Sequence, residues 1–166
     1  MTRSTRSFRT DMTPTSLRRL SIRGAGQDKR KEIRGAVTWM VPALVGKRMA
    51  GNLDITVRFV QNLGRYVGDC EWLDDNISPR QFLIRISTQQ SARQQLITLA
   101  HELTHMKQFV KNELFDYSTD SERSRWRHQV IDTSKMAYRD LPWEKDAYAT
   151  QKPLTDAYVK WLKQQH

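Results

Sequence analysis

The segment from Ser91 to residue 112 constrains the fold of this chain most, because it contains the longest regular apolar pattern in the sequence. Apolar side chains recur there at steps of three and four residues, which is the spacing of one face of an α-helix. Ser91 is a residue type that caps helix starts. The pattern therefore predicts a helix over residues 91–112, and its apolar positions are Leu96, Leu99, Ala100, Leu103, Met106 and Val110.

The middle of this predicted helix contains three polar side chains in the order His101, Glu102 and His105. Histidines four residues apart project from the same helical face, so both imidazoles can reach one ion. Zinc suits such a site because it binds nitrogen and carboxylate ligands. The carboxylate beside the first histidine is placed to take a proton from a water molecule at the metal. We therefore expect a zinc site on this helix, with Glu102 as general base.

A catalytic zinc ion usually has three protein ligands, so a third is expected downstream. His128 lies in a charged run, and His166 is the last residue. Glu144 is favoured, because Pro142 fixes the start of the last predicted helix and thereby the direction of a carboxylate in its first turn. Asp146 has a shorter side chain on a different face of that helix. The sequence leaves Asp146 and His128 open as alternatives to Glu144.

The other elements predict an α+β domain over residues 27–166. A helix is expected from Asp28 to Gly46, followed by three strands, at 53–59, 65–72 and 82–86, which we expect to form a small antiparallel meander. The last helix is expected to begin near Pro142 with Asp140 as its cap, and Pro153 to break or restart it. The helix at 91–112 should pack against the sheet.

The first 26 residues lack apolar periodicity and end in a Gly-Ala-Gly linker. Residues 1–34 contain ten of the 28 Lys and Arg residues and only three acids. Residues 1–26 are therefore expected to be a flexible basic arm that contacts nucleic acid or an acidic protein surface. In an alternative interpretation the arm is the working part of a nucleic-acid-binding or virion assembly protein, and the zinc site is structural or vestigial. The expected contacts of the arm are Arg3, Arg6, Arg9, Arg18, Arg19 and Arg23.

Composition excludes several classes of protein. The single cysteine, Cys70, cannot form an internal disulfide or a multi-cysteine zinc ribbon. No apolar run approaches the ~20 residues of a membrane-spanning helix, and no apolar segment follows the charged N-terminus as in a secretory signal. These features indicate a cytoplasmic protein with no membrane contact.

The segments 99–105 and 141–148, together with Trp126 and Tyr138, resemble small SprT-like or minimal gluzincin metallopeptidases of the kind that bacteriophages encode. The resemblance implies a minimal zincin-like fold, with zinc bound by two histidines of the motif and a glutamate on a later helix. Residue by residue, it implies His101, His105 and Glu144 as ligands and Glu102 as base. Such a protein would cleave peptide bonds in the host cytoplasm or in a virion.

Two tyrosines near these segments, Tyr138 and Tyr148, are the candidates for stabilising the transition state of such a reaction. The peptide substrate is expected to add itself as a strand to an exposed edge of the sheet beside the zinc.

Overall fold

The central sheet is built from four strands. In the computed structural model, which describes residues 6–117 and 122–166, these strands are β1 (Arg19–Arg23), β2 (Asp54–Val60), β3 (Gly68–Trp72) and β4 (Gln81–Ser87). Their order is β1-β2-β4-β3. β1 pairs parallel to β2, β2 pairs parallel to β4, and β3 pairs antiparallel to β4 at the edge of the sheet.

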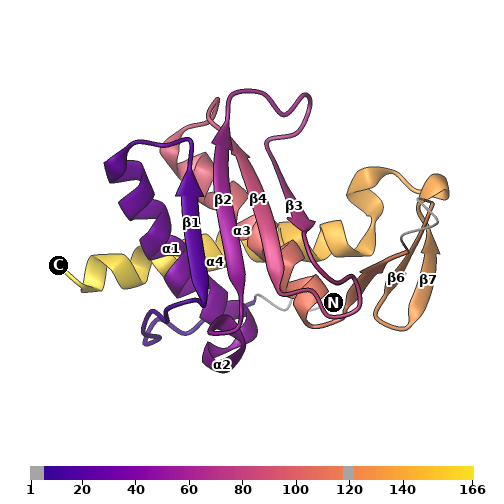
Figure 1. Cartoon of the computed structure of the whole chain (residues 1–166), viewed down its shortest axis with the longest axis horizontal. Helices are drawn as coiled ribbons and strands as arrows, with labels where there is room; N and C mark the ends of the chain where they lie inside the picture. The colour runs from indigo at the N-terminus through magenta and orange to yellow at the C-terminus, as the bar shows by residue number, and fades with distance from the viewer. Residues whose placement is uncertain (1–5, 118–121) are drawn as a thin grey trace.

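One face of this sheet lies against the helices, and the other is uncovered in Figure 1, where the strands stand in front of the helices. The helices are α1 (Gln27–Val45), the short α2 (Lys47–Ala50), α3 (Ala92–Val110) and α4 (Pro142–Gln164). Because side chains alternate between the two faces of a strand, the buried apolar side chains of β2 and β4 share the face that lies against the helices. The buried set is Ile55, Val57, Phe59, Phe82, Ile84 and Ile86.

The predicted meander is wrong in its strand order. All three predicted strands exist, but β2 and β4 are parallel neighbours, and β3 lies outside them at the edge. Apolar alternation specifies which side chains face the core, and both arrangements satisfy it equally. A parallel pair requires a long crossover, and the chain meets this requirement by passing through β3 between β2 and β4.

Strand β1 belongs to the central sheet, which corrects the prediction that residues 1–26 form a separate arm. It pairs with β2 along its whole length, from Arg19 opposite Asp54 to Arg23 opposite Arg58. Before β1, the backbone N–H of Thr15 donates to the carbonyl of Thr38 in α1. Helix α1 then supplies the crossover between the parallel strands β1 and β2.

A second, three-stranded antiparallel sheet follows α3, in a region where no strand is predicted from the sequence. It consists of β5 (Leu114–Asp116), β6 (Arg123–Trp126) and β7 (Gln129–Asp132), in that order. Two 3₁₀ turns, η1 (Thr133–Lys135) and η2 (Tyr138–Asp140), lead into α4. Figure 1 places β6 and β7 beyond β3, on the side of the molecule where α4 begins.

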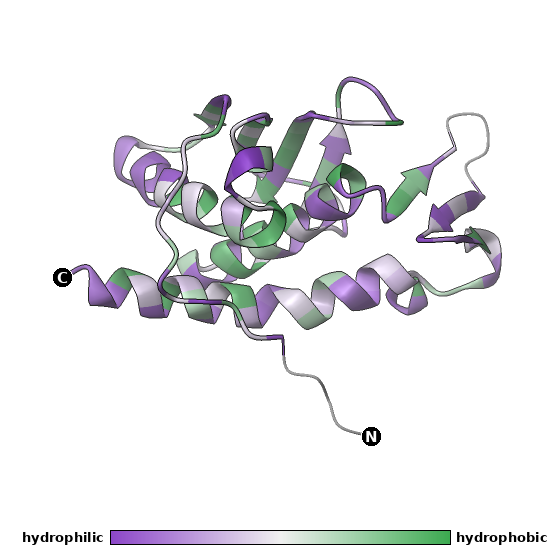
Figure 2. Cartoon of the chain, turned by 90° about the horizontal axis from the view of Figure 1, so that it is seen from below, coloured by the Kyte–Doolittle hydropathy of each residue, from purple (hydrophilic) through white to green (hydrophobic). Residues whose placement is uncertain are grey.

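The long helix α4 runs below α3 in Figure 2 and departs from the prediction in two details. Its N-cap is Leu141 rather than Asp140, and Pro142 occupies the first turn. Pro153 lies inside the helix and does not break it. Burial of the neighbouring Leu154 and Tyr158 offsets the hydrogen bond that a proline cannot donate.

The predicted α+β class is confirmed, with a helix at each end of the domain and a central helix against the sheet. The predicted capping of that central helix is confirmed as well, because the Ser91 hydroxyl accepts a hydrogen bond from the Gln94 backbone N–H at 3.2 Å. The structure therefore positions α3 between the sheet and α4, with its polar motif in the interior.

Candidate metal centre

Helix α3 brings its polar motif into the interior of the protein. His101 and His105 are each 8% exposed, and Glu102 is 5% exposed. The residues around them, from Leu99 to Met106, are all buried because α3 contacts the sheet on one side and α4 on the other. Buried imidazole and carboxylate groups require polar partners, and α4 supplies one of them.

That partner is Glu144, in the first turn of α4. Its Oε2 lies 3.1 Å from Nε2 of His101, and its Oε1 lies 3.1 Å from Nε2 of His105. The two Nε2 atoms are themselves 3.1 Å apart. The structure thus brings together a buried group of two imidazoles and one carboxylate that could hold a metal ion.

The opposite ring nitrogens determine which atoms of the imidazoles are free. Nδ1 of His105 lies 2.9 Å from Oε1 of Gln108, and the Gln108 amide donates to the carbonyl of Trp143 at 3.0 Å and to Oδ2 of Asp146 at 2.8 Å. With both amide hydrogens used, the oxygen of Gln108 must accept a hydrogen bond from Nδ1–H of His105. Nε2 of His105 therefore presents a lone pair toward Glu144.

A residue of α4 holds the ring of His101 in a similar way, through its Nδ1 atom. Its Nδ1 lies 2.9 Å from Oε1 of Gln151. When Gln151 accepts from this nitrogen, Nε2 of His101 also presents a lone pair toward Glu144. Lone pairs of two imidazoles and of a carboxylate then converge, and such a group is satisfied only by a cation.

The chemistry and spacing of this group fit a metal ion. Bonds of about 2.0–2.1 Å in tetrahedral geometry place neighbouring ligand atoms roughly 3.3 Å apart. The separations between the two Nε2 atoms and from each Nε2 to the nearest Glu144 oxygen are 3.1 Å. The two histidines meet different oxygens of Glu144, and one ligand atom from each of the three residues lies within 4.8 Å of the others, which is close enough for the three to hold one metal ion.

Without a metal, a proton supplies the positive charge. Burial opposes a charged imidazole, but the hydrogen bond to Glu144 and the nearby carboxylates raise the pKa of His105 to about 9. Burial likewise opposes ionisation of Glu144, but hydrogen bonds from His101 and His105 lower its pKa to about 2. The site is therefore built around one negative carboxylate and one exchangeable positive charge.

Glu102 is buried beside this group but does not share its hydrogen bonds. Burial raises the pKa of Glu102 to about 7, against the opposing effect of His105 and His101. Strand β3 passes very close to it, because a Cβ atom built on Gly68 would lie 3.0 Å from Oε1 of Glu102 and 2.5 Å from Cγ2 of Thr98. Only glycine allows this approach, so the edge strand runs directly past the carboxylate.

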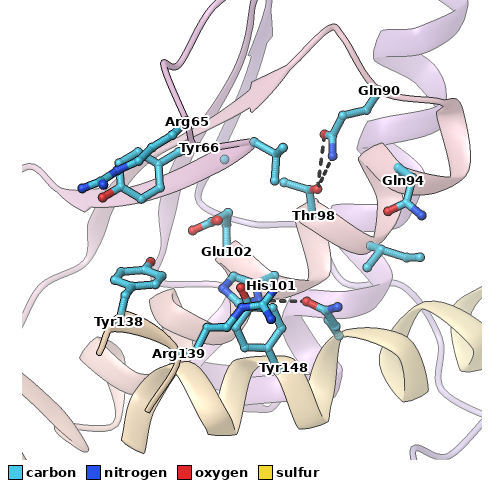
Figure 3. Close-up of a pocket in the computed structure, with 14 residues that line it drawn as sticks. Arg65, Tyr66, Gln90, Gln94, Thr98, His101, Glu102, Tyr138, Arg139 and Tyr148 are labelled. Carbon is cyan, nitrogen blue, oxygen red and sulfur yellow. Dashed lines mark hydrogen bonds between the residues drawn. The ribbon is translucent and has the colours of Figure 1, made fainter. Parts of the chain in front are cut away.

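Two hollows open on either side of Glu102, and both include Gly68, Tyr66 and Tyr138 in their lining. The first hollow, of about 570 Å³, reaches His101 and Tyr148 and is the one drawn in Figure 3. The second hollow, of about 280 Å³, reaches His105 and Glu144. Glu102 thus lines both hollows, next to the candidate metal group.

Both predicted tyrosines lie at this surface. The ring of Tyr148 is 4.8 Å from the ring of His101, in an edge-on arrangement. Burial and the neighbouring Glu144 raise the pKa of Tyr138, so its hydroxyl stays a hydrogen-bond donor at neutral pH. Tyr138 is still half exposed, and its ring is 6.0 Å from that of Tyr66.

The alternative third ligands do not join the group. His128 is exposed in the turn between β6 and β7, and His166 is exposed at the end of the chain. Asp146 is buried, but it accepts hydrogen bonds from Gln108 and Arg6 instead of approaching a histidine. Of the described residues, Glu144 is the carboxylate that meets both imidazoles.

Sequence analysis missed the residues that orient the two imidazoles. Gln108 follows His105 by three residues, which is a contact distance on a helix, so the spacing was a usable signal. Gln151 and Arg6 gave no such signal, because their contacts are made across 50 and 140 residues of sequence, respectively.

The arginines predicted to bind a polyanion differ in their contacts, since some form ion pairs within the protein and others are exposed. Arg6 forms an ion pair with Asp146 and donates to Oγ1 of Thr150 at 2.6 Å. Arg9 pairs with Asp11, and Arg18 pairs with Asp54. Arg19 and Arg23 are exposed on β1. Arg3 lies outside the described residues.

Comparison with protein-family models, with curated proteins and with solved structures gives no match for this chain. Among the described residues, no helix is both long enough and apolar enough to cross a membrane. The geometry and chemistry of the site itself are therefore the basis for inferring a function.

Proposed function

We propose that the protein is a zinc-dependent metallopeptidase in which His101, His105 and Glu144 hold the metal. The observation that supports this most directly is the convergence of two imidazole nitrogens and one carboxylate, with 3.1 Å between the nearest atoms of each pair, beside the carboxylate of Glu102, which lines both hollows. Two nitrogen ligands and one oxygen ligand are a donor set typical of catalytic zinc, which leaves a coordination position open.

Bound zinc would polarise the scissile carbonyl and acidify a water molecule. Glu102 takes a proton from the attacking water and transfers it to the nitrogen of the departing amine, so that water is added across the C–N bond. With a pKa of about 7, Glu102 accepts and releases a proton readily near neutral pH. Tyr138, whose hydroxyl faces Glu144 from the rim, supplies a hydrogen-bond donor for the developing oxyanion.

The peptide would lie along β3. Among the described residues this strand ends the sheet and pairs with β4 on one side only. An extended peptide can add to such an edge through main-chain hydrogen bonds. Since Gly68 brings β3 against Glu102, a peptide on this edge would pass the general base.

The test is the variant Glu102→Gln, which keeps the size of the side chain and removes its capacity to accept a proton. We expect it to bind zinc like the wild type and to lose peptide hydrolysis by at least a hundredfold. Glu71→Gln on the same edge strand is the matched control, because Glu71 is exposed on β3. Full hydrolysis by Glu102→Gln would refute the mechanism.

We propose polyanion binding as a second candidate function, and one observation in the sheet favours it. Arg23, Arg58 and Arg85 lie in register across β1, β2 and β4, and of these only Arg85 pairs with an acid, Asp69, among the described residues. Neighbouring like charges repel each other, and a nucleic-acid backbone would relieve that repulsion. A salt titration of DNA and RNA binding by wild type and Arg58→Glu tests it. Affinity that is equal for both proteins would contradict this candidate.

A further inference from the structure

The first hollow differs from the second in the charge of its lining. Arg65 and Arg139 line the first hollow, and among the residues that the structure describes Glu102 is the one carboxylate in its lining. Asp69, Asp116 and Glu144 join Glu102 in the second hollow, and none of the described residues that line it is a lysine or an arginine. The two sides of the general base therefore offer opposite electrostatic environments to a bound chain.

The two arginines approach the first hollow from different walls. Figure 3 shows Arg65 on the segment that leads into β3 and Arg139 on the opposite side, in η2 before α4. The guanidinium carbon of Arg65 lies 5.3 Å from the ring centre of Tyr66, which orients the side chain along the rim. Among the described residues, neither guanidinium has a carboxylate partner, so both are free to bind one.

The acids of the second hollow are, by contrast, mostly engaged. Asp69 forms an ion pair with Arg85, Glu144 belongs to the metal group, and Asp116 accepts a hydrogen bond from Ser124 at 2.9 Å. Their carboxylates disfavour a further carboxylate on that side. A carboxylate on a bound chain would therefore be directed to the first hollow.

We propose that the first hollow is an anion subsite, in which Arg65 and Arg139 bind a carboxylate of the substrate on the His101 side of the scissile bond. This inference rests on the proposed peptidase function and adds to it a substrate class, namely peptides with an acidic side chain or a free terminal carboxylate near the cleavage point. Arginine suits the role because its planar guanidinium can form two parallel hydrogen bonds with a carboxylate.

The experiment measures binding without hydrolysis. Zinc-loaded Glu102→Gln is titrated with fluorescent peptides that are identical except for a single Asp, moved along the chain, or Lys in the same position. Each peptide is made with a free and with an amidated C-terminus, which separates a side-chain carboxylate from a terminal one. We expect one Asp position or the free terminus to increase affinity roughly tenfold over Lys.

The double variants Glu102→Gln/Arg139→Glu and Glu102→Gln/Arg65→Glu should abolish this preference or reverse it to Lys. The control, Glu102→Gln/Arg48→Glu, makes the same charge change at an exposed position of α2, outside both hollows, and should preserve the preference. Equal affinity for the Asp and Lys peptides at every position would overturn the inference. An Asp preference that survives in both the Arg65→Glu and the Arg139→Glu double variant would also overturn it. Failure of the wild type to hydrolyse the preferred peptide would instead count against the proposed peptidase function, since the binding assay requires no turnover.

Discussion

The two histidines of the candidate metal centre occupy equivalent positions on α3 but are held in different ways. His105 is oriented by Gln108, whose amide is itself held by the Trp143 carbonyl and by Asp146. His101 is oriented by Gln151, whose side chain has no other hydrogen bond among the described residues.

The support for His105 also extends farther through the molecule. Asp146 is almost fully buried, with its side chain 4% exposed, and it is paired with Arg6 from the N-terminal segment. A chain of contacts thus links Arg6 to His105 through Asp146 and Gln108. His105 is therefore held by a network of hydrogen bonds, whereas His101 is held by a single partner. Mutations of these partners should change zinc affinity to different extents.

The largest difference is expected between Gln108→Ala and Gln151→Ala. Loss of Gln108 frees the His105 ring and removes one donor each from Asp146 and the Trp143 carbonyl, so zinc affinity should fall by about 10- to 100-fold. Gln151→Ala removes one hydrogen bond, and a decrease of less than about tenfold is expected. Zinc competition with a chromophoric chelator measures both. Equal losses would show that the two ligands are held alike.

A smaller effect is expected from Arg6→Ala, which removes the charged partner of buried Asp146. The unfolding free energy should fall by about 1–2 kcal/mol, a value reduced by the partial exposure of Arg6. Zinc affinity should decrease several-fold through Gln108. Arg9→Ala is the matched control, because Arg9 pairs with Asp11 in the same segment at the surface. Chemical denaturation and chelator competition provide the two measurements.

If Arg6→Ala lowers stability but leaves zinc affinity unchanged, the contact network ends at Asp146 and does not reach His105. Partial recovery by Arg6→Lys would indicate that charge, more than the guanidinium shape, holds Asp146. Either result would show how the support of His105 differs from that of His101.

The smallest expected effect is on the pH dependence of zinc binding. Since the pKa of metal-free His105 is raised to about 9, zinc binding below pH 9 must displace a proton, and affinity should rise with pH up to about 9. The hydrogen bond to Gln108 contributes to this raised pKa. Gln108→Ala should therefore move the end of the rise to lower pH, whereas Gln151→Ala should leave it in place. Calorimetry in buffers of different ionisation enthalpy counts the released protons, and identical profiles for the two variants would contradict this account.

Much of the site could be predicted because its signals are local. The helix and its motif of His101, Glu102 and His105 occupy one continuous segment, and Pro142 marks the start of the helix that presents Glu144. The roles of Gln151 and Arg6 could not be predicted in the same way. They depend on how α4 and the N-terminal segment pack against α3, which no periodicity in the sequence encodes.

In the sheet, too, features set by neighbouring residues were predictable, and pairings between distant segments were not. The alternation in residues 53–59 predicts β2 and its buried face, but not its partners. Strand β1 has only five residues and two exposed arginines at its ends, so its apolar signal is weak. It forms because β2 offers an unpaired edge and α1 provides the crossover.

The most direct test of the central claim is the zinc content per chain, measured by elemental mass spectrometry on folded protein. The account predicts about one zinc per chain in wild type and in Glu71→Gln, and a small fraction of that in Glu144→Gln. A folded wild type that retains no zinc after supplementation would contradict the metal centre. Undiminished zinc in Glu144→Gln would contradict the role of Glu144 as its third ligand.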